Sequence, residues 1–285
     1  MLQRSPSWVI GVPAEDSTGN LMRKYLPSWM ASQLIRWKFL VLPLLFFHFC
    51  RKFPNAARNI LRERTKKEIP SSISIDPNFN PRYNPWEQRL CVCPDSDFFK
   101  CLHDGKAEVV TDTIETFTSS GIELASGKTL DADIVITATG LKMQIAGGAK
   151  ISVDGTPYDY PSNYMWKGVM LQDMPNAVIV IGYTNASWTL GADITAGVLV
   201  RLMKHMRDNN FSSTVPKVHG KEMKSTPMLN LSSTYVEKAK GYLPMTGDRG
   251  PWKQRQNYLV DYWVAQYGNL TEDLEFTGGG FDKDQ

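Results

Sequence analysis

Two short apolar runs that end in glycine are the parts of this sequence best suited to contact a ligand. They are Asp131–Gly140 (DADIVITATG) and Ala177–Gly182 (AVIVIG). Each is rich in β-branched residues and lacks a helical period, which is typical of a buried strand in a parallel sheet. Ligands of open α/β sheets bind beyond the carboxyl ends of the strands, where a glycine lets the backbone approach a phosphate or a ring. The two runs therefore predict a ligand site at a sheet edge.

A helix is expected soon after the second run. Over Gly191–Arg207, apolar residues recur at i, i+3 and i+4, and basic residues gather in the last turns. Ser187 or Thr189 can cap its first turn. The amides at a helix N-terminus stabilise negative charge, so this helix start is the second element that could serve a ligand.

Other patterns of catalytic or ligand-binding residues are absent from the sequence. It contains no Gly-x-Gly-x-x-Gly turn, because Gly147-Gly148 and Gly278–Gly280 have the wrong spacing. No Ser-His-Asp arrangement and no metal-ligand spacing occurs. The cysteines show no disulfide framework, and we interpret them as reduced structural thiols. They are Cys50, Cys91, Cys93 and Cys101.

Composition indicates a globular chain. With 285 residues, of which 42% are hydrophobic and 21% charged, it can bury a substantial core in one or two domains. A net charge of +3, without a basic patch interleaved with aromatic residues, argues against nucleic-acid binding. The first residues do not resemble a signal peptide, so a cytoplasmic location is expected.

Residues from about 21 to 67 consist mainly of helix formers and include the apolar run Phe39–Cys50. That run is shorter than the ~20 residues needed to cross a bilayer, and Pro43 interrupts it. We interpret it as a core-facing helix. Cations flank the run on both sides, which also suits a helix at a membrane surface, so a peripheral membrane contact through residues 39–50 stays an alternative.

Four motifs together resemble the flavin-dependent monooxygenases of the flavin-containing and Baeyer-Villiger type, especially the branch of the ethionamide-activating enzymes. They follow the order of the family over nearly the whole chain. The resemblance implies an α/β fold with two dinucleotide-binding domains, with FAD and NADPH as cofactors. Because the Gly-rich turns are missing, the chain resembles the C-terminal portion of such an enzyme, truncated at the N-terminus. The motifs are Met1–Ser7 (MLQRSPS), Tyr83–Leu90 (YNPWEQRL), Ala138–Gly140 (ATG) and Gly182–Trp188 (GYTNASW).

The resemblance implies roles for residues in the first half of the chain. Arg4 and Ser5 would contact the phosphate on the adenosine ribose of NADPH, since a planar guanidinium binds phosphate with paired hydrogen bonds. Arg89 would be catalytic, as a fixed cation that keeps a flavin peroxide anionic and stabilises the oxyanion of the adduct with substrate.

The alternative role of Arg89 is structural. In that case it pairs with a neighbouring carboxylate, Glu87, Asp95 or Asp97.

The resemblance also implies contacts with the flavin. Thr139 and Gly140 would form a hinge that passes close to both cofactors. The start of the Gly191–Arg207 helix would stabilise negative charge on the pyrimidine edge of the reduced flavin. The residues placed to do this are Asn185, Ser187, Trp188 and Thr189.

The domain organisation follows the same resemblance. Residues 1–130 would be a remnant of the NADPH-binding domain, with a helical insertion at about 21–67 and a β-meander at about 107–130. The meander is predicted from short alternating runs at 107–111, 114–118 and 121–124. Residues 131–285 would be the C-terminal part of the FAD-binding domain.

The implied activity is an NADPH- and O2-dependent oxygenation through a C4a-peroxyflavin, with a ketone, sulfide or amine as substrate. Baeyer-Villiger insertion and S- or N-oxygenation both stay open. One alternative is another FAD or NAD(P)H oxidoreductase, which would not need Arg89. The other is a non-catalytic remnant, and we expect this chain alone to bind FAD poorly because half of the pyrophosphate site is not encoded.

Overall fold

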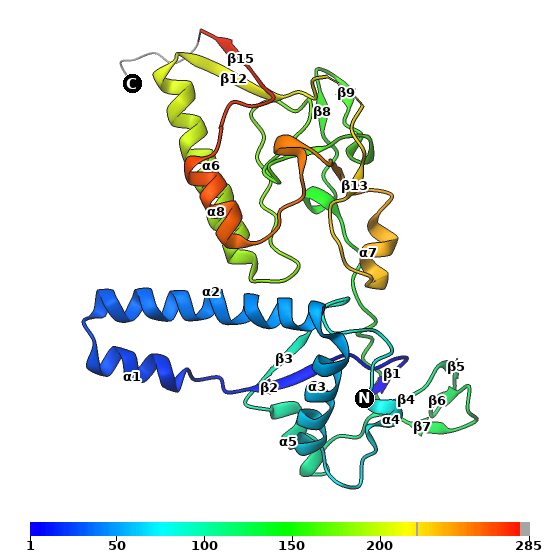
Figure 1. Cartoon of the computed structure of the whole chain (residues 1–285). Coiled ribbons are helices and arrows are strands. Elements are labelled where there is room, and N and C mark those ends of the chain that lie inside the picture. The colour runs from blue at the N-terminus through cyan, green and yellow to red at the C-terminus, as the bar shows by residue number, and fades with distance from the viewer. Residues whose placement is uncertain (221, 280–285) are drawn as a thin grey trace. The chain divides into compact units, whose positions relative to one another are not determined.

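The computed structural model describes residues 1–220 and 222–279, and the chain divides into two compact units (Figure 1). The first is Met1–Gly140 and the second is Leu141–Gln285. Each unit mixes helices with small sheets.

The first unit contains two pairs of parallel strands. β1 (Leu2–Gln3) pairs with β4 (Val110–Thr111), and β2 (Val9–Val12) pairs with β3 (Cys91–Pro94). Strands that pair in parallel need a long crossover between them. The crossover from β2 to β3 contains most of the helices of this unit.

The helical insertion expected at about 21–67 is present. It consists of α1 (Ser17–Tyr25), α2 (Ser28–Lys52) and α3 (Pro54–Glu68), followed by the short α4 (Ile75–Asn78). After β3, α5 (Asp97–His103) packs Phe99 and Leu102 into a core with Ile69, Phe79 and Val109.

The interpretation of Phe39–Cys50 as a core-facing helix interrupted by Pro43 is wrong. α2 continues through Pro43, which is exposed, and spans 25 residues. Only Ala31, Ile35 and Cys50 of this helix are buried. Within the described residues, α2 is the one helix long and apolar enough to cross a membrane, and 11% of its most apolar window is buried.

The predicted β-meander is present with one difference. β5 (Ile114–Phe117), β6 (Gly121–Leu124) and β7 (Thr129–Asp131) form a three-stranded antiparallel sheet. The run predicted at 107–111 contributes β4, but β4 pairs with β1 instead of joining the meander.

The two glycine-ended runs do not form the buried parallel strands predicted for them. Residues 132–140 are irregular, and Ile134 and Ile136 are 81% and 87% exposed. In Ala177–Gly182, Val178 alone makes a bridge, which is antiparallel and joins Met170. A strand forms only where a neighbour accepts its backbone hydrogen bonds, and no parallel neighbour lies beside either run in the described part of the chain.

The second unit is built around α6 (Trp188–Asp208) and the shorter α8 (Tyr258–Tyr267), which pack together. Beside α6, β12 (Phe211–Pro216) pairs antiparallel with β15 (Leu274–Gly278). A second buried cluster contains Met165, Leu171 and Met174. The remaining strands and α-helix are β8 (Ser152–Val153), β9 (Thr156–Pro157), β10 (Met165–Trp166), β11 (Met170–Leu171), β13 (Thr226–Pro227), α7 (Thr234–Ala239) and β14 (Met245–Thr246), and the described part of this unit also has three short 3-10 helices.

Candidate functional site

The start of α6 is capped by a side chain. The helix predicted over Gly191–Arg207 is present and begins at Trp188, three residues earlier. Ser187 is its N-cap, and its hydroxyl oxygen accepts a 3.3 Å hydrogen bond from the Thr189 amide. Ser187 fills this role because its extended backbone lets the hydroxyl reach back to a first-turn amide.

Two glycines let the start of α6 lie against the chain that precedes it. A Cβ on Gly182 would lie 2.5 Å from Cγ of Trp188, and a Cβ on Gly191 would lie 2.2 Å from the Ile181 carbonyl oxygen. No real side chain is tolerated at those distances. Glycine at both positions therefore fixes how closely residues 181–182 approach the first turn of α6.

A small pocket adjoins this helix start. Its space of about 40 Å³ is far below the 300–1,000 Å³ typical of pockets that enclose a small molecule, so it does not enclose a cofactor by itself. Asn185 lines the pocket, whereas Ser187, Trp188 and Thr189 are exposed outside it. The lining also includes Met165, Gly182, Tyr183, Thr184, Met228 and Arg255.

Arg255 joins the pocket to α6. Its guanidinium donates a 2.7 Å hydrogen bond to the Ile181 carbonyl oxygen and a 2.9 Å hydrogen bond to the Thr195 hydroxyl. Thr195 in turn donates to the Gly191 carbonyl oxygen at 2.9 Å. Burial lowers the pKa of Arg255. This side chain ties the end of the Ala177–Gly182 run to the second turn of α6.

A buried tyrosine and a half-buried carboxylate complete the surroundings of the helix start. The Tyr183 hydroxyl donates a 2.7 Å hydrogen bond to Asp261 of α8. Burial raises the pKa of both groups, and the Asp261 carboxylate raises that of Tyr183 further. Sequence reasoning missed Arg255, Tyr183 and Asp261 as site-forming residues. A charged residue within the aromatic-rich segment 251–258 was the signal that could have found Arg255.

In the first unit, Arg4 and Ser5 directly follow β1, at the carboxyl end of a strand that pairs in parallel. Both are exposed. Arg4 makes no hydrogen bond or ion pair with any residue that the structure describes. Its guanidinium is therefore available to an anion at a place where such sheets bind ligands.

The loop that carries Arg89 is fastened to the segment that carries Arg4 and Ser5. Trp8, which is buried, donates its indole N–H to the Tyr83 carbonyl oxygen at 3.1 Å. The amide of Cys91 donates to the Trp8 carbonyl oxygen at 2.8 Å. The structure thus brings the two segments together through one residue.

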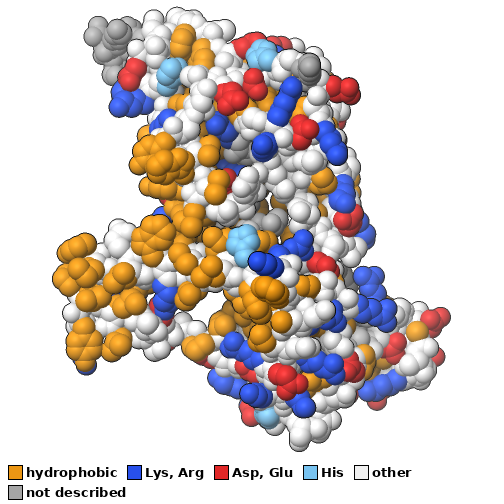
Figure 2. All heavy atoms as spheres, viewed as in Figure 1, with side chains coloured by type: hydrophobic (Ala, Val, Ile, Leu, Met, Phe, Trp, Pro, Cys, Tyr) orange, Lys and Arg blue, Asp and Glu red, His pale blue; other side chains and the backbone are white. Residues whose placement is uncertain are grey.

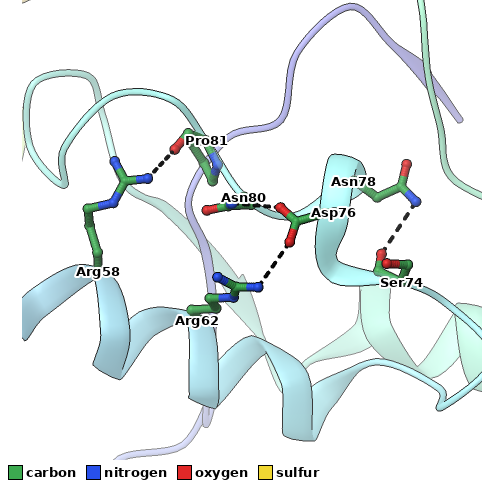
Figure 3. Close-up of polar contacts among 7 residues, drawn as sticks. All are labelled: Arg58, Arg62, Ser74, Asp76, Asn78, Asn80 and Pro81. Atoms are coloured by element: carbon green, nitrogen blue, oxygen red, sulfur yellow. Dashed lines mark hydrogen bonds and ion pairs between the residues drawn. The ribbon is translucent and has the colours of Figure 1, made fainter. Parts of the chain in front are cut away.

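Helix α3 also fixes the loop that carries Arg89. Arg58 donates to the carbonyl oxygens of Pro81 at 3.0 Å and Tyr83 at 3.2 Å. One turn further along α3, Arg62 contacts Asp76 at 2.9 Å, and Asp76 also accepts from the Asn80 side chain at 2.6 Å (Figure 3). Two arginines of one helix therefore fix the chain leading to Arg89.

Arg89 itself is half-buried and lies two residues before β3. Of the carboxylates named as its structural partners, Asp95 accepts from the Ala14 amide at 2.8 Å and Asp97 pairs with Lys100 at 3.2 Å. Glu87 accepts from the backbone and side chain of Asn84. Arg89 also takes part in an interaction of its own, so the structural role stays open beside the catalytic one.

Thr139 and Gly140 lie at the boundary between the units, and both are exposed. Gly140 has φ of +104°, a conformation that glycine adopts without strain. The residues implied to bind NADPH, together with Arg89, thus lie in the first unit, and those implied to face the flavin start α6 in the second.

Comparison with known proteins reveals relatives over nearly the whole chain, although no family model matches. FAD-containing monooxygenase EthA of Mycolicibacterium smegmatis is 41% identical over 97% of this chain and 56% of its own length. The probable FAD-binding monooxygenase AlmA of Acinetobacter baylyi is 42% identical over 92% of this chain and 52% of its own length. The chain therefore spans about half the length of these relatives.

Solved structures with the same fold have much lower identity. The crystal structure of OTEMO in complex with FAD and NADP matches 97% of this chain and 62% of that one, with a TM-score of 0.63 and 12% identity. An oxidised steroid monooxygenase bound to NADP matches 98% of this chain and 62% of its own, with a TM-score of 0.59 and 15% identity. These matches confirm the α/β fold expected from the sequence. By sequence, the chain is similar over nearly its whole length to flavin-dependent monooxygenases, EthA and AlmA among them.

Proposed function

We propose that this chain acts within an NADPH- and O2-dependent flavin monooxygenase. The observation that carries the proposal is the 41% identity to an FAD-containing monooxygenase across 97% of the chain. In this proposal residues 1–130 belong to the NADPH-binding domain and residues 131–285 to the FAD-binding domain. FAD, when bound and reduced by NADPH, supplies the activation of O2.

The nicotinamide cofactor is assigned to the exposed segment after β1. Arg4 would bind the 2′-phosphate through its planar guanidinium, and Ser5 would add a hydroxyl donor to the same phosphate. Their position at the carboxyl end of a parallel strand supports this assignment. The residues fit a phosphate by charge, by exposure and by place in the fold.

The flavin is assigned to the start of α6. This helix has 21 residues, so the aligned peptide dipoles and free first-turn amides favour negative charge at its N-terminus. Asn185 would add an amide donor from the pocket, and the exposed Trp188 ring offers a face for stacking. Ser187 and Thr189 would hold the helix start in place through the cap.

Arg89 is assigned the role of a cation beside the reacting centre. Its position would be kept by Trp8 and Arg58, which fasten the loop on two sides. A half-buried guanidinium held this way stabilises developing negative charge on oxygen without first having to reorient. Thr139 and Gly140 would let the chain pass between the two cofactor sites.

We assign a ketone, sulfide or amine as substrate and a cytoplasmic location.

The assignment of Arg4 can be tested on the chain itself. Binding of NADPH and NADH is measured by isothermal titration, with the chain intact and with Arg4→Ala. Loss of one charged hydrogen-bonding group costs about 1.5–3 kcal/mol, so NADPH should bind roughly 10- to 100-fold less tightly to the variant, with NADH unchanged. Lys106→Ala, which removes an exposed cation paired with Asp104, is the matched control. Equal affinities for NADPH and NADH in the intact chain would contradict the assignment.

A non-catalytic remnant, the alternative raised by the sequence analysis, is the second candidate. The two candidates differ in flavin binding and reduction. Protein expressed from the complete reading frame that contains this chain is titrated with FAD and then mixed with NADPH under anaerobic conditions. Loss of the yellow colour of the bound flavin on adding NADPH supports the monooxygenase proposal, and protein that binds no FAD, or that leaves bound FAD oxidised, supports the remnant.

A further inference from the structure

The helices α1 and α2 carry many large apolar side chains that the rest of the described chain leaves uncovered. Tyr25 and Trp29 are 69% and 68% exposed on either side of the turn that joins the two helices. Figure 2 shows hydrophobic side chains gathered over both helices. We call this the α1–α2 apolar surface and define it by Leu21, Tyr25, Trp29, Trp37, Phe39 and Leu42.

Such a surface is costly in water. Burying one large apolar side chain contributes about 1.5–3 kcal/mol, and contiguous exposed apolar patches usually mark a contact with a protein or a membrane. The apolar residues of α2 are spread around the helix instead of forming one stripe, and helices of that kind are normally covered. Something outside the described chain is therefore expected to cover it.

The distribution of charged residues indicates what kind of partner would cover the α1–α2 apolar surface. Between Ser17 and Arg62 the sequence has eight Lys and Arg and no Asp or Glu. The whole chain has 32 Lys and Arg against 29 Asp and Glu, so the remainder, with 24 against 29, is net acidic. Six of these eight cations lie on α1 and α2, the helices that carry the exposed apolar residues, and the other two, Arg58 and Arg62, lie on α3. An anionic partner complements both features.

The cations are arranged as at a membrane interface. Lys24 lies over the ring of Tyr25 at 5.3 Å, and Lys52 lies over the ring of Phe53 at 5.6 Å. Each pair places an ammonium group beside an aromatic ring at the end of a helix. Long cationic side chains and aromatic rings take this arrangement where headgroups meet acyl chains.

We propose that the α1–α2 apolar surface binds an anionic phospholipid bilayer, with α2 lying along the headgroup region. This inference does not depend on the reaction proposed above. A second copy of the chain is disfavoured, because the same excess of cations would lie on both sides of such an interface. A spanning helix is disfavoured, because α2 contacts the first unit near both ends.

Those contacts are specific. Near its start, Ile35 is buried and Lys38 forms an ion pair with Asp16 of the chain before α1. Near its end, Phe47 packs edge-on against Trp86 at 5.6 Å between ring centres, and Cys50 is fully buried. A helix held by protein along one side cannot be surrounded by lipid, but it can lie on a bilayer.

Vesicle co-sedimentation of the 285-residue chain tests the proposal. Vesicles of phosphatidylcholine alone are compared with vesicles containing about 30% phosphatidylglycerol, at low and high salt. We expect binding to the anionic vesicles that weakens with salt. Each exposed cation contributes about 1 kcal/mol, so reversing both charges in Arg23→Glu/Lys24→Glu should reduce partitioning at least about 10-fold. Trp29→Ser/Trp37→Ser should cause a loss of similar size.

Matched control variants change the same chemistry elsewhere. Trp263→Ser/Tyr267→Ser removes two aromatic rings from α8 that are 66% and 67% exposed. Lys204→Glu/Arg207→Glu reverses two exposed charges on α6. Both should leave vesicle binding within about twofold of the unchanged chain, the range expected of surface substitutions outside the contact. The thermal unfolding midpoint of each variant is measured first, and only variants whose midpoint matches that of the unchanged chain are compared. Lost binding is then not confused with unfolding.

Three outcomes would overturn the proposal. One is failure to bind anionic vesicles at low salt, and another is equal loss of binding in the control variants. The third is a concentration-dependent dimer in sedimentation equilibrium without lipid that Trp29→Ser/Trp37→Ser abolishes, which would assign the surface to a second copy.

Discussion

Arg255 should be a major source of stability for the second unit. Arg255→Met keeps most of the side-chain length but removes the donors to the Ile181 carbonyl oxygen and the Thr195 hydroxyl. Arg255 donates four hydrogen bonds, and the two shortest, at about 1.5–3 kcal/mol each, amount to roughly 3–6 kcal/mol. Removing the buried guanidinium charge offsets part of this loss in stability, because taking that charge out of water destabilises the folded state. We expect a net loss of about 2–4 kcal/mol in the free energy of unfolding.

Urea unfolding monitored by hydrogen exchange measures this loss of stability and shows which part of the chain loses it. With an m-value of about 2 kcal/mol/M, the midpoint for the second unit should fall by roughly 1–2 M. The Gly191 amide in the first turn of α6 should lose protection first, because Arg255 joins this turn to the Ile181 carbonyl. Amides in the first unit should be unaffected.

Arg207→Met provides the comparison. Arg207 is exposed and forms its ion pair with the adjacent Asp208, so its loss should change stability by no more than about 0.5 kcal/mol. Arg255→Lys should fall between the two variants, since one ammonium cannot reach both acceptors with the geometry of a guanidinium. If Arg255→Met and Arg207→Met are equally stable, Arg255 does not hold the start of α6 as argued.

Three further predictions follow from single groups. Ser187→Ala should cost about 1 kcal/mol through loss of the N-cap, lowering the thermal midpoint by about 2–4 °C, whereas Ser187→Asp should retain the cap and the midpoint. Burial raises the pKa of Asp261 above 3.8, so the folded chain keeps a proton that the unfolded chain releases, and stability should fall as the pH rises from about 3.8 through the raised pKa. Asp261→Asn cannot titrate, and urea midpoints across this range should show a flatter profile; an identical slope would contradict the argument. Burial raises the pKa of Cys50 to about 11, so iodoacetamide should label the exposed Cys101 in the native chain and Cys50 only after unfolding, as read by mass spectrometry.

Much of the local structure could be predicted from the sequence. The α6 helix, its Ser187 cap and the turns of the β-meander depend on residues within a few positions of one another, so their signals lie in short stretches of chain. The similarity to flavin-dependent monooxygenases likewise follows from motifs that keep their order along the chain. The close approach of Gly182 and Gly191 to neighbouring atoms explains why glycine stands at these places.

Only the tertiary structure decided what these stretches do together. Asp131–Gly140 has the composition of a buried strand but is exposed, because a strand also needs partners that its own residues cannot specify. Phe39–Cys50 has the composition of a core helix, yet its burial depends on which surfaces face it, and most of α2 stays uncovered. In the sequence, Arg255 resembles an ordinary loop cation. The fold brings it within hydrogen-bonding distance of Ile181 and Thr195, which lie more than fifty residues earlier. Composition and short spacing are properties of a segment, whereas pairing, burial and charge environment arise from residues far apart in sequence.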